Sequence, residues 1–336
     1  MTVNGVGENN FHAEIFNVPL MFNAQCDILL LNMKAAEKRL AQTAERPSAD
    51  DAAKVAEYRR ELGKYAKPSV TADIVAVRPV YNERNGHHWR ENPKFAIEVL
   101  FIKRGQWPYE GCWALPGGFI RPTESVEEGA RRELREETAL EAERLIPVGV
   151  FSKPERDMRA WIMSNAFVSV HKCGEGCHVK GGDDAAMAKW LRVETPTINH
   201  SRFYLPFYDG DKREFCLSGA YREEDLGGGT VSFVEENPLA FDHAEIIAQA
   251  FLRMLSFDLK KLVFFFLPDK FTLANYIDIY QYLTRYSITP GNIPNFRRQL
   301  TATKDPLLVP CEGELEDLGG RGHAPAMLYR RNPVGN

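Results

Sequence analysis

The order of hydrophobic and polar positions predicts a helical start to the chain. Apolar residues recur at helical spacing in two series: Leu29, Met33, Ala36, Leu40, and then Ala52, Val55, Tyr58, Leu62. Between the two series, Arg46-Pro47-Ser48 combines a helix stop with an N-cap candidate. We therefore expect residues 1–68 to form an N-terminal helical hairpin. Its apolar faces would pack on the next domain or on a second copy of the chain, so a homodimer is expected.

The middle of the chain reads mainly as strands. Segments rich in β-branched and aromatic residues are predicted strands: 69–81, 95–103, 145–151, 160–171 and 186–192. A hairpin is predicted around Asp209-Gly210, because Asp-Gly favours a tight turn. Gly227–Gly229 then marks a flexible joint. This pattern gives a domain at 69–195 and a hairpin insertion with its linker at 196–238.

The last part of the chain, 239–336, predicts helices followed by a ribbon. Helical patterns cover 239–256, 272–283 and 293–300, and the apolar run 262–266 has the length of a buried strand. Short apolar segments near Leu307 and Tyr329 enclose a Gly-rich loop. Helices followed by a two-stranded ribbon are the outline of a winged helix-turn-helix.

Composition indicates the number of domains and the cellular environment of the protein more than its function. A chain of 336 residues has room for two or three domains, and its net charge of −4 gives no overall attraction to nucleic acid or acidic membranes. The start lacks a basic region followed by an apolar one, and no apolar run approaches the length of a membrane span. Six scattered cysteines do not make a disulfide framework. A cytoplasmic protein without a membrane partner is expected.

The chemistry concentrates on a helix that follows a glycine turn, Pro116-Gly117-Gly118. Ser125 and Glu128 form a capping box at the start of that helix. One stripe then reads Val126, Gly129, Ala130, Glu133, Glu136, Glu137 and Leu140. A stripe that is apolar at both ends should face inward, and buried carboxylates need a partner or a metal. Three carboxylates at this spacing suit Mg²⁺ or Mn²⁺, whereas an ordinary charged helix would carry its acids on the other face.

This stretch resembles the Nudix box, which has the pattern G-x5-E-x7-R-E-U-x-E-E-x-G-U with U aliphatic. The matching residues are Gly118, Glu124, Arg132, Glu133, Leu134, Glu136, Glu137 and Leu140. Ala139 departs from the pattern, because the family has its last glycine there. The resemblance implies an α/β/α sandwich around a mixed sheet at 69–195. It also implies metal binding by Glu133, Glu136 and Glu137, with Arg132 orienting Glu124.

A second resemblance covers most of residues 239–331. The segments 239–246, 271–273, 295–298 and 325–330 are similar to the Nudix-related transcriptional regulator family. There a Nudix domain senses ADP-ribose-like ligands and a winged helix binds DNA, for which Asn295, Arg297 and Arg298 are the candidates here. Against DNA binding, the wing holds four acids and one basic residue: Glu312, Glu314, Glu316, Asp317 and Arg321. Because the Nudix glutamates are all kept, a Nudix hydrolase is our first reading and a ligand-sensing regulator the alternative.

The substrate is inferred from two loops. Residues 151–159 and 182–185 resemble segments of ADP-ribose pyrophosphatases, so ADP-ribose is the first candidate ligand. Gly117, Gly118 and Arg159 are candidate substrate contacts. The acids that could act as general base are Glu155, Asp157, Asp183 and Asp184. Trp107, Tyr109 or Trp113 could stack an adenine, with core packing as the alternative.

A cysteine hairpin is the remaining motif with chemical interest. His171, Cys173, Cys177 and His178 lie within eight residues and invite a zinc reading. The C-x3-C spacing is less common for zinc than C-x2-C, and Gly174 and Gly176 explain a hairpin tip without a metal. Zinc at Cys173 and Cys177 therefore ranks below the tip as an interpretation.

Overall fold

The structure, a computed structural model, describes residues 49–81, 95–142, 144–171, 185–223, 229–233, 237–316 and 325–333. The chain divides into two compact units, Met1–Ala66 and Lys67–Asn336. The first contains helix α2 (Ala49–Leu62), which matches the second helix of the predicted hairpin. The first helix of that hairpin lies outside the described residues. On α2, Val55 and Tyr58 are exposed, and the homodimer stays a prediction.

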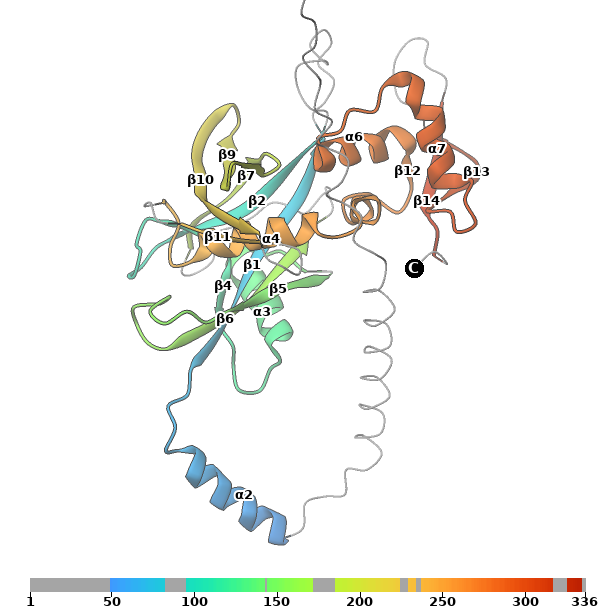
Figure 1. The fold of residues 1–336 in the computed structure, drawn as a ribbon. Coiled ribbons are helices and arrows are strands. Elements are labelled where there is room, and N and C mark those ends of the chain that lie inside the picture. The colour runs from blue at the N-terminus through green and yellow to red at the C-terminus, as the bar shows by residue number, and fades with distance from the viewer. Residues whose placement is uncertain are drawn as a thin grey trace, which may run out of the picture. The chain divides into compact units, whose positions relative to one another are not determined.

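The second unit contains the remaining strands and helices (Figure 1). The strands are β1 (Ser69–Tyr81), β2 (Phe95–Arg104), β3 (Trp113–Ala114), β4 (Gly117–Phe119), β5 (Leu145–Phe151), β6 (Ile162–Val170), β7 (Ala185–Val193), β8 (Thr197–Asn199), β9 (Arg202–Asp209), β10 (Lys212–Glu223), β11 (Gly229–Ser232), β12 (Phe271–Thr272), β13 (Leu308–Glu316) and β14 (Ala326–Arg331). The helices are α3 (Val126–Thr138), α4 (His243–Leu255), α5 (Leu259–Leu262), α6 (Leu273–Thr284) and α7 (Ile293–Thr301), with the 3-10 turns η1 (Val263–Phe265) and η2 (Pro290–Asn292).

Within the described residues, β1 to β11 form one mixed sheet. Its main path runs β11-β10-β9-β7-β2-β1-β6-β5, while β3, β4 and β8 pair with β2, β1 and β9. β1 pairs in parallel with β6 and antiparallel with β2 and β4. The predicted hairpin is present as β9 and β10, and β9 pairs with β7, so the hairpin extends the sheet. The predicted domain boundaries stay predictions.

The central strand β1 sends alternate side chains into two hydrophobic cores, because successive residues of a strand face opposite sides. Ala72, Ile74 and Ala76 pack with Ala130 and Leu134 of α3. On the other face, Val75 and Val77 pack with α4 and with residues that follow it. A mixed sheet between α3 and α4 is the α/β/α sandwich that the sequence led us to expect.

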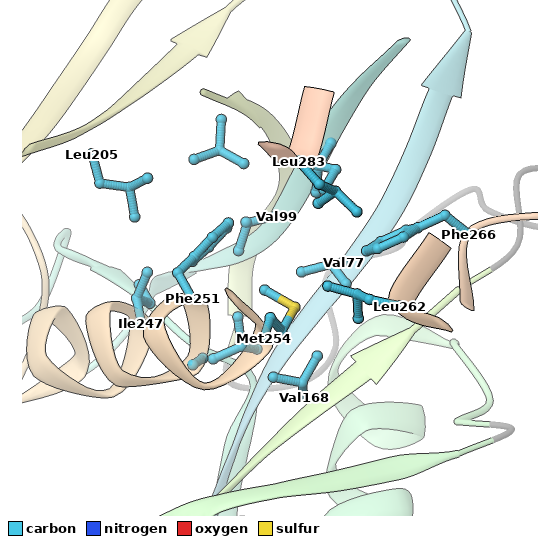
Figure 2. Packing of buried hydrophobic residues seen from close by; sticks show 14 of the residues in the cluster. Val77, Val99, Val168, Leu205, Ile247, Phe251, Met254, Leu262, Phe266 and Leu283 are labelled. Atoms are coloured by element: carbon cyan, nitrogen blue, oxygen red, sulfur yellow. The ribbon is translucent and has the colours of Figure 1, made fainter. Parts of the chain in front are cut away.

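Helix α4 supplies the larger core with a row of apolar side chains. Figure 2 shows Ile247, Phe251 and Met254 directed toward Val77 and Val99 of the sheet. These three positions are spaced by four and three residues, which places them on one face of a helix. Leu262 and Phe266, also labelled in Figure 2, continue the same core beyond α4.

The run 262–266 corrects one of our predictions, since it is not a strand. It forms the end of α5 and the turn η1, with the Asp258 carboxylate accepting a hydrogen bond from the Lys260 backbone nitrogen at 3.0 Å. Leu262, Val263 and Phe266 are buried. They follow one another at intervals of one and three residues, a spacing that places all three on the same side of a helical turn. A short apolar run does not distinguish strand from helix, so the packing surface decided.

The C-terminal part has the predicted order of two helices and a ribbon. After α6 and α7, β13 and β14 pair as an antiparallel ribbon, and the short β12 joins the other edge of β14. Thr272 caps α6 in a capping box with Asn275. This part is attached to the large sheet, since Thr195 donates its hydroxyl to the Tyr282 carbonyl at 2.7 Å and Phe95 meets the Tyr282 ring edge-on. No described helix is long and apolar enough to cross a membrane.

The α4 core generates a stability prediction. Phe251 is 4% exposed, and Phe251→Ala should lower the free energy of unfolding by about 3–5 kcal/mol, because it leaves a cavity in the core. Phe257, three residues after Met254 and just beyond the end of α4, is 39% exposed and provides the matched control. We expect Phe257→Ala to cost less than about 1 kcal/mol in the same urea titration. Equal losses in the two variants would contradict the α4 packing described here.

Candidate active site

Helix α3 begins and ends as its sequence predicts. The Ser125 hydroxyl accepts from the Glu128 backbone nitrogen at 3.2 Å, and the Glu128 carboxylate accepts from the Ser125 nitrogen at 2.7 Å. The helix ends at Ala139, whose φ of 61° is left-handed. Ala139 thus keeps the left-handed backbone conformation that the family's glycine adopts easily. The alanine Cβ makes this conformation strained.

The acidic stripe lies at the border of the buried face of α3. The fully buried positions are Ala130, Leu134 and Thr138, while Glu133 and Glu137 are half-buried and Glu136 is exposed. The prediction that the whole stripe faces inward is therefore wrong. The helix turns its small and apolar residues to the sheet, which leaves the carboxylates along the edge where a ligand can reach them.

The Gly117-Gly118 turn lies directly against this edge. A Cβ at Gly118 would lie 2.5 Å from the Glu133 carboxyl carbon, and one at Gly117 would lie 2.2 Å from the Ala72 carbonyl oxygen. Strand β4 pairs here with β1, so the turn has no room to move away. The Gly117 backbone nitrogen donates to Glu137 Oε2 at 2.9 Å. Glycine is thus required by close approach, and the turn positions two of the three carboxylates.

Arg132 balances the charge of the site and is itself buried. It forms a bidentate salt bridge with Glu124, in which Nη2 donates to Oε1 at 2.6 Å and Nε donates to Oε2 at 3.0 Å. Its Nη1 donates to Glu133 at 2.7 Å and to Glu136 at 2.9 Å. The hydrogen bonds from Arg132 lower the pKa of Glu124 to about 2. The ion pair that the Nudix resemblance implied between Arg132 and Glu124 is therefore present in the structure.

Glu137 has the opposite electrostatic character. Burial raises its pKa to about 8, and the charges of Glu133 and Asp73 add to this effect. The Gly117 hydrogen bond and the Arg104 charge oppose the rise without cancelling it. The protein therefore leaves the negative charge of Glu137 poorly compensated, which is the condition that a bound cation would relieve.

The donor set fits a hard divalent cation. Glu133, Glu136 and Glu137 offer carboxylate oxygens, the ligands that Mg²⁺ and Mn²⁺ prefer. In the part of the chain that the structure describes, no three acidic, histidine or cysteine side chains already form a closed metal-binding group. Arg132 explains this arrangement, because its guanidinium holds Glu133 and Glu136. These carboxylates would have to turn from Arg132 to share a cation with Glu137.

The other predicted site residues lie in different surroundings. Arg159 pairs with Asp157, Nη2 to Oδ2 at 2.6 Å, and lies over the ring of Phe119 at the edge of the glycine turn. Burial raises the pKa of Asp157, but hydrogen bonds from Arg159 outweigh burial and leave that pKa lowered. A carboxylate held in this way is a weak base. Glu155 is exposed, and Asp183, Asp184, Cys173 and Cys177 lie outside the described residues.

The three aromatic residues that could stack an adenine differ in how exposed they are. Trp113 is 9% exposed and packs edge-on against Phe101 in the large core, as the packing alternative predicted. Trp107 is 70% exposed. Tyr109 lies 4.9 Å from the ring of Phe241, centroid to centroid.

Sequence reasoning missed a buried polar cluster behind the glycine turn. Arg156 donates to Asp242 at 2.6 Å and to Asp73 at 3.3 Å, and the Ser164 hydroxyl donates to Asp73. His243 Nδ1 accepts from the Leu115 nitrogen at 2.9 Å, while Nε2 lies 3.6 Å from Asp73. Burial lowers the pKa of His243 although Asp73 raises it, so the neutral ring that accepts from Leu115 is favoured. The residues come from four distant segments, of which only 151–159 and 239–246 were noted for a family likeness, and neither likeness indicated that they meet.

The DNA-binding candidates lie on the surface of α7. Asn295, Arg297 and Arg298 are all exposed, and Arg298 donates to the Asn295 side chain at 3.0 Å. On β13, Glu312, Glu314 and Glu316 are exposed, and Lys270 pairs with Glu314 at 2.5 Å. Asp317 and Arg321 lie outside the described residues. Both the cations that favour DNA and the acids that oppose it therefore face solvent.

Comparison with known proteins identifies the class of domain. The sequence profile of the NUDIX domain matches residues 80–209. The chain therefore contains a Nudix domain, with the box on α3 and the turn before it.

Relatives extend the likeness in two directions. An ADP-ribose pyrophosphatase from Methanocaldococcus jannaschii is 43% identical over 94 residues, 28% of this chain and 54% of the relative. The chain thus spans about half the length of that relative. An ADPR responsive transcriptional repressor, NtrR, from Acinetobacter baylyi is 22% identical over 82% of this chain and 86% of its own. A crystal structure of a MutT/nudix family protein from Enterococcus faecalis has the same fold, with a TM-score of 0.55 and 24% identity over 89% of this chain and 98% of its own.

The Arg132–Glu124 pair generates a pH prediction. Because the folded-state pKa of Glu124 lies below the ordinary 4.5, its ionised form stabilises the fold above that pH, and the contribution disappears as the pH falls toward about 2. Glu124→Gln should therefore lower the melting temperature at pH 7, and the gap to the parent protein should close below pH 4.5. Glu127→Gln, an exposed change three residues later in the first turn of α3, is the control and should leave melting unchanged across this range. A gap that does not depend on pH would contradict the ionic origin of the effect.

Proposed function

We propose that this chain is a divalent-metal-dependent Nudix pyrophosphohydrolase of a nucleoside diphosphate linked to another moiety, with ADP-ribose as the first substrate. The observation that carries the proposal is the placement of Glu133 and Glu137 against the Gly117-Gly118 turn. The 43% identity with an ADP-ribose pyrophosphatase over 94 residues supports the choice of substrate. Because that alignment covers only 28% of this chain, the substrate rests on the site residues as well.

Glu133, Glu136 and Glu137 would hold the cation, which is Mg²⁺ or Mn²⁺ in this proposal. When bound, the metal supplies positive charge that neutralises and orients the diphosphate. Arg132 keeps Glu133 and Glu136 at the edge of α3, and Glu124 fixes Arg132 from the other side. The Gly117 backbone nitrogen orients Glu137. Each carboxylate is thus held in place by another protein group, Arg132 for Glu133 and Glu136 and the Gly117 backbone for Glu137.

The reaction adds water across the P–O–P linkage. The water oxygen forms a bond to one phosphorus as the bond to the bridging oxygen breaks, so ADP-ribose yields AMP and a sugar phosphate. The bare backbone of the Gly117-Gly118 turn lets a phosphate approach closely, since neither residue carries a Cβ. Arg159 stands at the edge of this turn, where a guanidinium can pair with phosphate oxygens.

Removing the charge of Glu137 tests the proposal. Glu137→Gln keeps the shape of the side chain but removes a carboxylate that would hold the metal, so turnover should fall by roughly a hundredfold or more. Glu141→Gln is the matched control, because Glu141 is exposed and pairs with the likewise exposed Arg135 at 3.4 Å. Release of AMP from ADP-ribose with Mg²⁺ or Mn²⁺ gives the measurement. Activity equal to that of the parent protein in Glu137→Gln would contradict the proposed function.

The alternative function is a regulator that senses an ADP-ribose-like ligand and binds DNA. It is favoured by the alignment with the NtrR repressor, which spans the Nudix domain and the C-terminal part together. It is also favoured by Arg297 and Arg298, which are exposed on α7. Glu312, Glu314 and Glu316 oppose it, since their charges would repel DNA phosphates beside the ribbon. We therefore rank the enzyme first.

A gel-shift titration separates the two functions. At physiological salt we expect weak or no binding to DNA upstream of the protein's own operon, because the acids of β13 offset the arginines of α7. Tight binding that ADP-ribose releases, and that Arg297→Ala/Arg298→Ala abolishes, would reverse our ranking. Arg253→Ala, an exposed change on α4, controls for the loss of positive charge.

A further inference from the structure

The segment that leads into α4, residues 237–243, lies along the approach to the glycine turn. We name this segment the α4 strap. The Trp113 nitrogen donates to the Pro238 carbonyl at 3.2 Å, and the Ala240 nitrogen donates to the Trp113 carbonyl at 2.8 Å. Two residues on, the Leu115 nitrogen donates to His243. The strap therefore pairs with the segment that ends in Gly117, although it begins 28 residues after the NUDIX match ends at 209.

The end of the strap is fixed by buried charges. Arg156 donates to both carboxylate oxygens of Asp242, from Nε at 2.8 Å and from Nη2 at 2.6 Å. Arg156 is 9% exposed, and Asp73 of β1 contacts it from the other side. A two-pronged pair between buried groups leaves little freedom in the backbone on either side of Asp242. Phe241, the residue before this anchor, is therefore held in one orientation.

Phe241 has a backbone conformation that a phenylalanine rarely adopts. Its φ of 53° lies in the left-handed region, where the Cβ of a bulky residue is crowded. Strain of this kind persists only when the surroundings impose it, and it is concentrated at functional sites. Here the strained backbone directs the Phe241 ring toward Tyr109 and the side chains of two arginines.

The two arginines lie over the Phe241 ring. The guanidinium carbon of Arg104 is 5.0 Å from the ring centroid, and that of Arg159 is 5.3 Å away. Arg159 also lies 5.6 Å from the Phe119 ring, so aromatic and cationic groups alternate in the order Phe119, Arg159, Phe241, Arg104. An aromatic face attracts a guanidinium without occupying its N–H donors, which lie in the guanidinium plane. The contact with Phe241 therefore fixes the direction of each arginine without using its donors, of which Arg104 Nε binds the Pro108 carbonyl at 2.7 Å and Arg159 Nη2 binds the Asp157 carboxylate at 2.6 Å.

We infer that Phe241 is a positioning residue that holds Arg104 and Arg159 for the anionic diphosphate of the ligand. This inference rests on the proposed function, because it places the diphosphate at the Gly117-Gly118 turn. Phe119 ends β4 directly after that turn, and Arg104 ends β2, which pairs with β3 just before the turn. Residues beyond the Nudix match would then complete the ligand site.

A binding experiment without turnover tests the inference. Isothermal titration with ADP-ribose and with inorganic pyrophosphate, in EDTA, measures affinity separately from hydrolysis. We expect Phe241→Leu to weaken both ligands by about tenfold, since it keeps apolar bulk but removes the face that holds the arginines. Phe241→Tyr should stay within about twofold of the parent protein. Phe257→Leu is the matched control, because Arg253 lies over the Phe257 ring at 5.8 Å in the same kind of contact, at the far end of α4 from the strap. This variant should bind both ligands as the parent protein does.

A double-mutant cycle separates positioning from packing. If Phe241 acts through Arg104, then Phe241→Leu and Arg104→Gln are not additive, and the double variant binds little worse than Arg104→Gln alone. A general packing role predicts additive losses, no rescue by tyrosine and a lower melting temperature for Phe241→Leu. Those results would overturn the inference, as would weaker binding of ADP-ribose with unchanged binding of pyrophosphate. A parent protein that binds neither ligand in EDTA would contradict this inference as well, because the arginine contacts need no metal. A parent protein that releases no AMP from ADP-ribose with Mg²⁺ or Mn²⁺ would instead contradict the proposed function itself, whereas an active parent with an unaltered Phe241→Leu contradicts this inference alone.

Discussion

The whole arrangement depends on the alternation of side chains along β1. Its even-numbered positions, Ala72, Ile74 and Ala76, pack beneath α3, and its odd-numbered positions, Asp73, Val75 and Val77, face the α4 side. One strand therefore holds both layers of the sandwich in register. Because β4 pairs with β1 at Asp73, the same strand also places the glycine turn against the carboxylates of α3.

The site is organised by an unequal distribution of charge. Arg132 neutralises Glu124, Glu133 and Glu136, whereas Glu137 sits apart under the Gly117 nitrogen with its charge poorly compensated. An arginine enclosed by carboxylates keeps them close together without a metal, which ordinary repulsion would prevent. Because both Glu133 and Glu136 face Arg132, they would have to turn from it to share a cation with Glu137. A hydrolase and a sensor of a metal-bound ligand could use this arrangement equally.

The C-terminal part is joined to the Nudix domain by more than a linker. α4 fills one face of the sheet, and the α4 strap reaches the glycine turn through Trp113 and His243. At the other end, Tyr282 and Thr195 connect α6 to the end of β7. A ligand at the turn and the α7 surface are thus linked through one continuous core. This continuity gives the regulator alternative a physical basis, even though the acids of β13 weigh against DNA.

The sequence by itself determined the local elements and the identity of the box. Capping residues set the starts of α3 and α6, and β-branched runs set β1 and β5 at the residues predicted, because these signals act between near neighbours. The spacing of Glu133, Glu136 and Glu137 likewise needed only helical geometry.

Tertiary structure decided what short patterns leave open. The run 262–266 became helical because the core beside α4 accepted a helical turn, and the face of α3 rotated so that Leu134, not the acids, met the sheet. Only folding could bring Asp73, Arg156 and the strap residues Phe241 and His243 behind one turn, because Asp73 and Arg156 are 83 residues apart and Leu115, which donates to His243, is 128 residues from it.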